Sequence, residues 1–242
     1  FILEEGLPLD KLRRVVATMA EVASAAGVSI VTGDTKVVER GKGDGIFITT
    51  SGIGRCLWPT AIMPQAIAPG DCIILSGDVG RHAVAILAAR QGFETRPVIN
   101  SDVASLHASV QNIFDTGVLP HCMRDLTRGG LGTALLELAR QSGLDCEIDE
   151  NRLPLMPGVA SVVEALGLDP WFLANEGRYI CIVPETHANV VLAAMQKADP
   201  DVQPVLLGHF LDSRHGNVII RNDYGAKRRL RMPLQEPLPR IC

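Results

Sequence analysis

The sequence lacks several features that would assign it to a particular class of protein. Its six cysteines form no CxxC pair, so their spacing matches no zinc framework. A formal net charge of −4 argues against a protein that binds nucleic acid through bulk positive charge. No apolar run reaches the roughly 18 residues of a membrane-spanning helix, and the first residues have no signal-peptide pattern. These absences predict a cytoplasmic protein with reduced cysteines and neither a nucleic-acid nor a membrane partner.

The composition is that of a chain with a large core. Of its 242 residues, 47% are hydrophobic and 21% are charged, which suits one large domain or two ordinary ones. Apolar residues at helical spacing predict helices over residues 9–26, 81–91, 102–114, 158–167 and 185–197, and one that starts at the glycines of 129–132. Short apolar runs predict strands over residues 28–32, 45–50, 72–77, 146–150, 178–184, 204–211 and 217–221, with a solvated edge strand over 226–231. Because these elements interleave without the regularity of a doubly wound sheet, we expect a mixed α/β (α+β) fold.

The first stretch with candidate chemistry is VTGDTKVVERGKGDG, residues 31–45. Its glycines permit close approach of a ligand to the backbone, Asp34 could hold a hard cation, and Lys36 could meet phosphate oxygens. Loops at strand ends are where ligand sites concentrate. A polar turn between two strands remains the alternative, because short motifs often match by chance.

The second stretch, RDLTRGGLGTALLELA over residues 124–139, places three glycines at the start of a helix. The free N–H groups and the dipole of a helix N-terminus favour an anion there. Asp125 is suited to a metal ion and Arg128 to a phosphate. The alternative is a tight turn whose glycines allow the helix to pack closely against a sheet.

Two further turns and the C-terminus complete the candidates. In LANEGRYICIVP, Glu176 stands just before an apolar strand, where a carboxylate needs a partner or a task. In SGDVGRHAVAI, His82 lies in the first turn of a helix, where a structural role is the commoner one. The chain ends in EPLPRIC, which puts Cys242 on a proline-rich tail. Glycine-rich anion sites and metal-capable aspartates together suggest nucleotide phosphate chemistry.

In GDTKVVERGKGDGIFITTSGIG, RDLTRGGLGTALLELA, LANEGR and the terminal PRIC, the chain resembles the HypE family of hydrogenase maturation proteins. This family lies in the superfamily of aminoimidazole ribonucleotide synthetase and selenophosphate synthetase. The resemblance runs along the whole chain and implies a two-domain PurM-like architecture. Residues 1–65 would be the remainder of an ATP-binding and dimerisation domain, 66–230 a domain of a mixed sheet packed with helices, and 231–242 an extended tail. The family's usual glycine-rich beginning and its GTxND motif are absent, so the N-terminal domain is expected to be incomplete.

The resemblance also implies a reaction and partners. A carbamoyltransferase, HypF, would place a carbamoyl group on the sulfur of Cys242. ATP and Mg²⁺ would then drive the removal of water to give a thiocyanate. The cyanide would pass to iron on the HypC–HypD complex, for the active site of nickel–iron hydrogenase. A full-length protein would be a homodimer.

By the same resemblance, each motif residue receives a role. The catalytic residues would be Cys242, Glu176 as the base and Lys36. Asp34 and Asp125 would hold magnesium or its waters. The nucleotide would be bound by Asp34, Thr35, Lys36, Asp125, Thr127, Arg128, Gly129, Gly130 and Asn175. Two alternatives remain: a selenophosphate synthetase, which would need a reactive cysteine or selenocysteine near the N-terminus, and a non-catalytic scaffold fragment. Ala83 stands where relatives often have glycine after His82.

Overall fold

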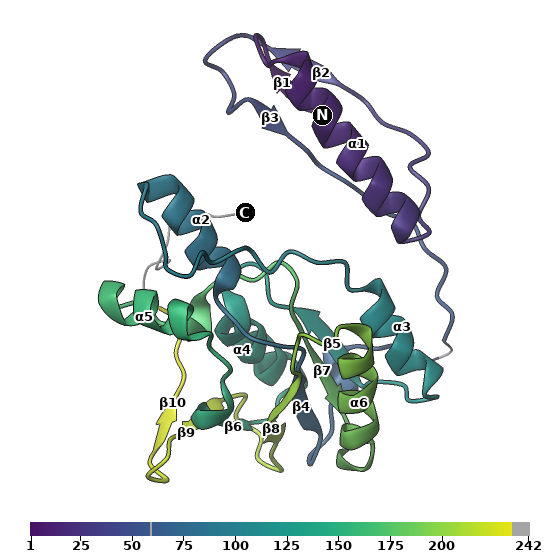
Figure 1. Cartoon of the computed structure of the whole chain (residues 1–242). Helices are drawn as coiled ribbons and strands as arrows, with labels where there is room; N and C mark the ends of the chain where they lie inside the picture. The colour runs from purple at the N-terminus through teal and green to yellow at the C-terminus, as the bar shows by residue number, and fades with distance from the viewer. Residues whose placement is uncertain (59, 234–242) are drawn as a thin grey trace. The chain divides into compact units, whose positions relative to one another are not determined.

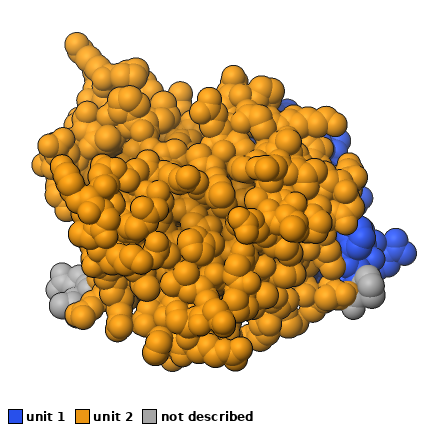
Figure 2. Space-filling model, turned by 90° about the horizontal axis from the view of Figure 1, so that it is seen from below, with its two compact units in different colours: residues 1–59 blue, residues 60–242 orange. Residues whose placement is uncertain are grey.

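The computed structural model describes residues 1–58 and 60–233, so Cys242 lies outside the described residues. The chain divides into two compact units, Phe1–Pro59 and Thr60–Cys242 (Figure 2). The division falls a few residues before the expected domain boundary between residues 65 and 66. Within the described residues, no helix is long and apolar enough to cross a membrane.

The first unit is a helix with a small three-stranded sheet. Helix α1 spans Leu9–Ala25. The sheet has the order β2-β1-β3, in which β1 runs parallel to β2 and antiparallel to β3. Its strands are β1 (Ile2–Glu4), β2 (Lys36–Val38) and β3 (Ile46–Phe47). The helix was predicted, but the strand expected over residues 28–32 is wrong, because these residues pair with no strand and Val31 is 86% exposed.

The second unit is built on a seven-stranded mixed sheet of the order β10-β9-β6-β8-β4-β7-β5 (Figure 1). Its strands are β4 (Cys72–Leu75), β5 (Cys122–Asp125), β6 (Cys146–Asp149), β7 (Tyr179–Val183), β8 (Val205–Phe210), β9 (Val218–Arg221) and β10 (Lys227–Arg229). Its helices are α2 (Arg81–Gln91), α3 (His107–Asp115), α4 (Gly130–Ser142), α5 (Pro157–Leu166) and α6 (Ala188–Ala198). Short 3₁₀ turns lie at Pro64–Ala66, Glu150–Arg152, Pro170–Phe172 and Glu185–His187. Only β6 and β9 pair in parallel within this sheet, as far as the described residues show.

Helices cover both faces of the central strands. Alternate side chains of β4 point to opposite faces, so Ile73 packs with α4 while Ile74 packs with α3 and α6. Figure 1 shows α4 on one side of these strands and α3 and α6 on the other. A third cluster joins α2 to α5 through Val84 and Val159. The buried strands explain why the chain needs so many apolar residues.

Two departures from the predicted elements concern the site. The predicted helix 102–114 begins only at His107, and residues 101–105 have no regular secondary structure. The strand β5 was missed, because its four residues include the charged Arg124 and Asp125. The edge strand β10 is present and all three of its residues are exposed.

A buried aspartate fixes the loop that precedes β9. The side chain of Asp145 is only 5% exposed. It accepts hydrogen bonds from the Ser213 hydroxyl (2.7 Å), the Asn217 main-chain N–H (2.7 Å) and the His215 ring (3.0 Å). Burial by itself would raise the pKa of Asp145, but these hydrogen bonds outweigh it and lower the pKa to about 2. The carboxylate is therefore stabilised in the folded state.

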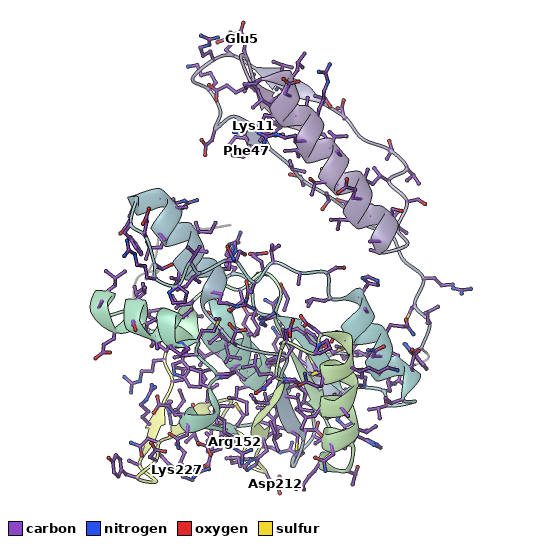
Figure 3. The ribbon with its side chains drawn as sticks, viewed as in Figure 1. Glu5, Lys11, Phe47, Arg152, Asp212 and Lys227 are labelled. Carbon is purple, nitrogen blue, oxygen red and sulfur yellow. The ribbon has the colours of Figure 1, made fainter. Side chains whose placement is uncertain are left out.

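We expect Asp145→Asn to lower the free energy of unfolding at neutral pH by about 2 kcal/mol. The folded pKa lies below the unfolded value of about 3.9, so the contribution is complete above that value and is lost as the pH falls toward 2. Urea unfolding between pH 7 and pH 2 measures the difference. Asp212→Asn, which removes an exposed aspartate at the lower end of this unit, is the control (Figure 3). If the difference in free energy of unfolding between wild type and Asp145→Asn stayed constant down to pH 2, the lowered pKa of Asp145 would be contradicted.

Candidate active site

The loop between β5 and α4 gathers most of the predicted phosphate-binding residues. Its start is fixed by the Leu126 N–H, which donates to the main-chain oxygen of Arg178 (3.1 Å). Gly129 and Gly130 both have left-handed backbones, with φ of 72° and 64°. A Cβ at Gly130 would collide with the main-chain oxygen of Leu173, so only glycine fits there. Gly130 therefore allows the close packing that was the alternative explanation for these glycines. The same residue is the first of the 13-residue helix α4, which begins at the end of the loop.

The polar side chains of this loop are partly or fully exposed. Asp125 is 46% exposed, accepts a hydrogen bond from the Thr127 hydroxyl (2.7 Å) and pairs with Arg124. Arg124 also pairs with Glu137 of α4 (3.1 Å). Arg128 is exposed. A carboxylate, a hydroxyl and a guanidinium thus surround the positive end of α4, which suits a phosphate with its counter-ion.

Asn175 ties three loops together from inside. It is fully buried, with 0% exposure. Its carbonyl oxygen accepts the Gly80 N–H (2.8 Å), and its amide nitrogen donates to the main-chain oxygens of Leu126 (3.2 Å) and Leu173 (2.9 Å). The side chain predicted to contact nucleotide is therefore engaged within the fold, where it holds the β5–α4 loop in place.

An ion-pair network lies next to Asn175. Arg178 is 4% exposed and donates to a carboxylate oxygen of Asp78 (2.7 Å). The other carboxylate oxygen of Asp78 lies 2.7 Å from Nε of Arg81, the first residue of α2. A buried arginine of this kind is retained only with such a partner. The network joins the turn before α2 to the turn that contains Glu176.

The irregular segment of residues 101–104 lies against the turn that contains Glu176. Asp102 accepts the main-chain N–H of Glu176 (3.0 Å), and a Cβ on Gly177 would collide with the main-chain oxygen of Asp102. One ring nitrogen of His82 lies 2.8 Å from the Ser101 hydroxyl. Residues 101–104 were predicted to begin a helix. Instead they contact the Glu176 turn and His82 of α2.

Unpaired polar atoms concentrate in this region. Among the described residues, the buried side-chain N and O atoms without a hydrogen bond belong to Asp78, Arg81, His82, Asp102 and Glu176. The atoms of Asp78 and Arg81 face each other as an ion pair, which leaves three without a partner. Native proteins satisfy nearly all buried polar groups, so this concentration makes the region a candidate functional site.

The predicted residues of the first unit lie at the start of β2. Asp34 accepts the main-chain N–H of Thr35 (2.8 Å), and the exposed Lys36 is the first residue of the strand. They lie in the unit of residues 1–59, so the geometry described above does not include them.

The C-terminal tail begins beside the N-terminus of α4. Leu230 is 3% exposed, and its N–H donates to the main-chain oxygen of Val218 (2.8 Å). Two residues later, the sulfur of Met232 accepts a hydrogen bond from the hydroxyl of Thr133, in the first turn of α4 (3.5 Å). The part of the tail that ends in Cys242 is not among the described residues.

The residues present suit a magnesium ion that is shared with phosphates. No group of three or more histidine, cysteine or acidic side chains converges as a metal cage within residues 1–58 and 60–233. Magnesium is usually held by one or two carboxylates together with substrate phosphates and waters. Asp125 is an exposed carboxylate at the phosphate-binding end of α4 and fits that pattern.

Sequence reasoning missed Asp78, Arg81, Asp102 and Arg178. Asp78 and Arg81 lie within the SGDVGRHAVAI turn that was noted for His82, but nothing local distinguishes them. Their partners are distant in sequence, for example Arg178 for Asp78. The signal for Asp102 was its position before an apolar periodic run, which predicted a helix start instead.

Comparison with known proteins identifies both units. The N-terminal domain model of the AIR synthase related proteins matches residues 1–56, and the C-terminal domain model matches residues 68–221. The carbamoyl dehydratase HypE of Azotobacter vinelandii is 43% identical over 242 residues, which cover 100% of this chain and 71% of that relative. The predicted fold class agrees with both domain models.

Solved structures give the same relationship. The crystal structure of hydrogenase maturation protein HypE in complex with ATP is 42% identical, with a TM-score of 0.94 over 100% of this chain and 73% of that one. The crystal structure of a HypE–HypF complex is 38% identical, with a TM-score of 0.91 over 96% of this chain and 75% of that one. The resemblance seen in the sequence motifs is thereby confirmed. The chain belongs to the HypE family of hydrogenase maturation proteins, within the AIR synthase related proteins.

Proposed function

We propose that the protein uses ATP to dehydrate a carbamoyl group on the sulfur of Cys242 to a thiocyanate. The observation that carries this proposal is the start of the tail at Met232, against the first turn of α4. Ten residues follow Met232 up to Cys242. An extended segment of that length spans up to about 33 Å, which is ample for a thiol to reach the loop of residues 125–130.

The first step would transfer the γ-phosphoryl group of ATP to the carbamoyl oxygen. Hydroxide leaves an amide poorly, whereas phosphate leaves well, so phosphorylation makes the loss of that oxygen possible. Such transfers depend on positioning and charge neutralisation. Thr127, Arg128 and the N–H groups at the start of α4, with Gly129 and Gly130, would hold phosphate oxygens.

The remaining phosphate contacts would come from the first unit. Lys36 would neutralise charge on the transferred group, and the Thr35 backbone would support the loop. Asp34 and Asp125 would hold magnesium or its waters, and the ion would supply charge neutralisation of the phosphates. Asn175 would contribute indirectly, because its buried amide already holds the Leu126 main chain (3.2 Å).

Glu176 would take the first proton from the carbamoyl nitrogen, assisted by Lys36. This proton leaves as the oxygen is phosphorylated, which gives a carbamimidic phosphate, S–C(=NH)–OPO₃. The carbon–oxygen bond then breaks, and the second proton departs with the phosphate. The sum converts the thiocarbamate and ATP into the thiocyanate, ADP, phosphate and one proton.

The partners follow from the proposed reaction. HypF would load the carbamoyl group, a proposal supported by the HypE–HypF complex of a related protein. A HypC–HypD complex would accept the cyanide, for the iron of nickel–iron hydrogenase. We also propose that the protein acts in the cytoplasm as a homodimer.

Removal of one phosphate contact tests the assignment. Arg128→Ala should leave carbamoyl loading unchanged and slow the ATP-dependent formation of thiocyanate about 30-fold, because a charge-assisted hydrogen bond is lost. Mass measurement of the loaded tail peptide over time gives both rates. Arg140→Ala, which removes the same charge from the last turn of α4, is the control. Equal rates for wild type and Arg128→Ala would exclude Arg128 from the site.

A further inference from the structure

Asp102 is a buried carboxylate of which only one oxygen is hydrogen-bonded. Its exposure is 3%, and Oδ1 accepts the main-chain N–H of Glu176 (3.0 Å). Oδ2 is buried and has no hydrogen-bond partner among the described residues. A buried acceptor in this state costs free energy that a structural aspartate avoids. Asp145, the structural counterpart, has both oxygens hydrogen-bonded.

The side chain of Glu176 shows the same feature. Its Oε1 atom is also buried without a partner in the part of the chain that the structure describes. Asp102 is bonded to the main chain of this residue, and Gly177 packs directly on the Asp102 backbone. The two residues are thus joined through the Glu176 main chain, and the carboxylate of each keeps one buried oxygen that accepts no hydrogen bond among the described residues.

The segment that carries Asp102 is braced from the opposite side. The Ser101 hydroxyl accepts the Val103 N–H (3.1 Å) and lies 2.8 Å from Nδ1 of His82. Both residues that flank Asp102 therefore take part in one hydrogen-bonded turn. This brace fixes the carboxylate although no regular element contains it.

Oδ2 of Asp102 and Oε1 of Glu176 could both be satisfied by a ligand that donates two hydrogen bonds. A neutral amide NH₂ group has two N–H bonds on one planar nitrogen. A divalent cation is the other chemistry that would satisfy carboxylates. The proposed function supplies an amide on Cys242, and the last measurement below distinguishes an amide from a cation.

We propose that Asp102 binds the substrate: its Oδ2 accepts one N–H of the carbamoyl amide while Glu176 accepts the other. This inference rests on the proposed dehydration of a carbamoyl group on Cys242. The arrangement orients the amide so that Glu176 receives only one of its two protons. The other stays on the nitrogen, hydrogen-bonded to Asp102, until the phosphate leaves. It also makes the site specific for an unsubstituted amide, because an ester or a carboxylate brings no N–H.

Asp102→Asn separates this role from a structural one. Asparagine keeps an oxygen for the Glu176 N–H but turns an NH₂ donor toward the amide. We expect normal loading by HypF, normal Mg-ATP affinity and dehydration slowed about 100-fold. Asp145→Asn, which removes another buried carboxylate, should lower stability and leave the rate of dehydration unchanged in the folded protein.

The outcomes separate the two proposals. If wild type forms thiocyanate and Asp102→Asn forms it equally fast, the role of Asp102 is overturned and the proposed function stands. If wild type forms none, the proposed function itself fails. If both aspartate variants slow dehydration equally, the role of Asp102 is structural and the inference is overturned.

A spectroscopic measurement on the wild-type protein tests the inference without a rate comparison between variants. Wild type is loaded with a ¹⁵N-labelled carbamoyl group and mixed with a non-hydrolysable ATP analogue and Mg²⁺. We expect two separate N–H resonances, both protected from exchange with solvent. In Asp102→Asn one of them should move and the other should keep its position. Protection of a single N–H would overturn the inference. Loss of protection when the Mg²⁺ concentration is raised further would also overturn it, because a cation would then occupy the carboxylates.

Discussion

Cys242→Ala is expected to abolish carbamoyl loading of the folded protein. The proposed carrier must be a thiol that reaches a second protein, and most other cysteines cannot. Burial raises the pKa of Cys122 to about 11 and that of Cys181 to about 12, so their thiolates are scarce near neutral pH. Burial likewise raises the pKa of Cys72 and of Cys146.

Cys56 supplies the matched control. It is the one exposed free cysteine among the described residues. Its thiol donates to the main-chain oxygen of Trp58 (3.3 Å). Mass spectrometry after incubation with HypF, a carbamoyl donor and ATP should show loading in Cys56→Ala and none in Cys242→Ala. Loading in Cys242→Ala and none in Cys56→Ala would instead identify Cys56 as the carrier.

Glu176→Gln is expected to accept the carbamoyl group normally and then to stall. Loss of a positioned general base typically slows a reaction by 10² to 10⁴-fold, so we expect thiocyanate to form about 1,000-fold more slowly. Glutamine preserves the size of the side chain, and the main-chain N–H at this position still reaches Asp102. Loss of rate would therefore report lost basicity, not a collapsed turn.

The comparison variant for this experiment is Glu185→Gln. Glu185 is an exposed glutamate in the turn after β7, whereas Glu176 precedes that strand. Quenched samples of each loaded variant, separated by the mass of the tail peptide, give the rates of loading and dehydration independently. Formation of thiocyanate by Glu176→Gln at the wild-type rate would remove Glu176 from the reaction.

Elements with strong local signals were predictable from the sequence. Helix α2 was predicted over residues 81–91, and it spans Arg81–Gln91 because Gly92 takes a left-handed backbone (φ 70°) after it. Strand β4 was predicted from a purely apolar run and is completely buried. The glycines before α4 indicated the turn correctly, since Gly130 packs against the Leu173 main chain.

The parts of the site that depend on distant contacts were not predictable. Val103, Leu106, Val110 and Ile113 give residues 102–114 a helical period, yet the segment around Asp102 has no regular secondary structure. The hydrogen bond from the Glu176 N–H to Asp102 joins residues 74 positions apart, which no local pattern reveals. The assignment of Asn175 to nucleotide remains a prediction. Its hydrogen bonds to Gly80 and Leu126 connect residues that are distant in sequence, and the motif did not indicate them.

Tracing the carbamoyl oxygen tests the central claim most directly. The protein is loaded with a carbamoyl group that contains oxygen-18, and one turnover is started with unlabelled Mg-ATP in ordinary water. If the oxygen attacks the γ-phosphate, the released phosphate must contain one labelled oxygen for each thiocyanate formed on the tail. Label that appears in water, or phosphate released without label, would contradict dehydration through a phosphorylated carbamoyl group.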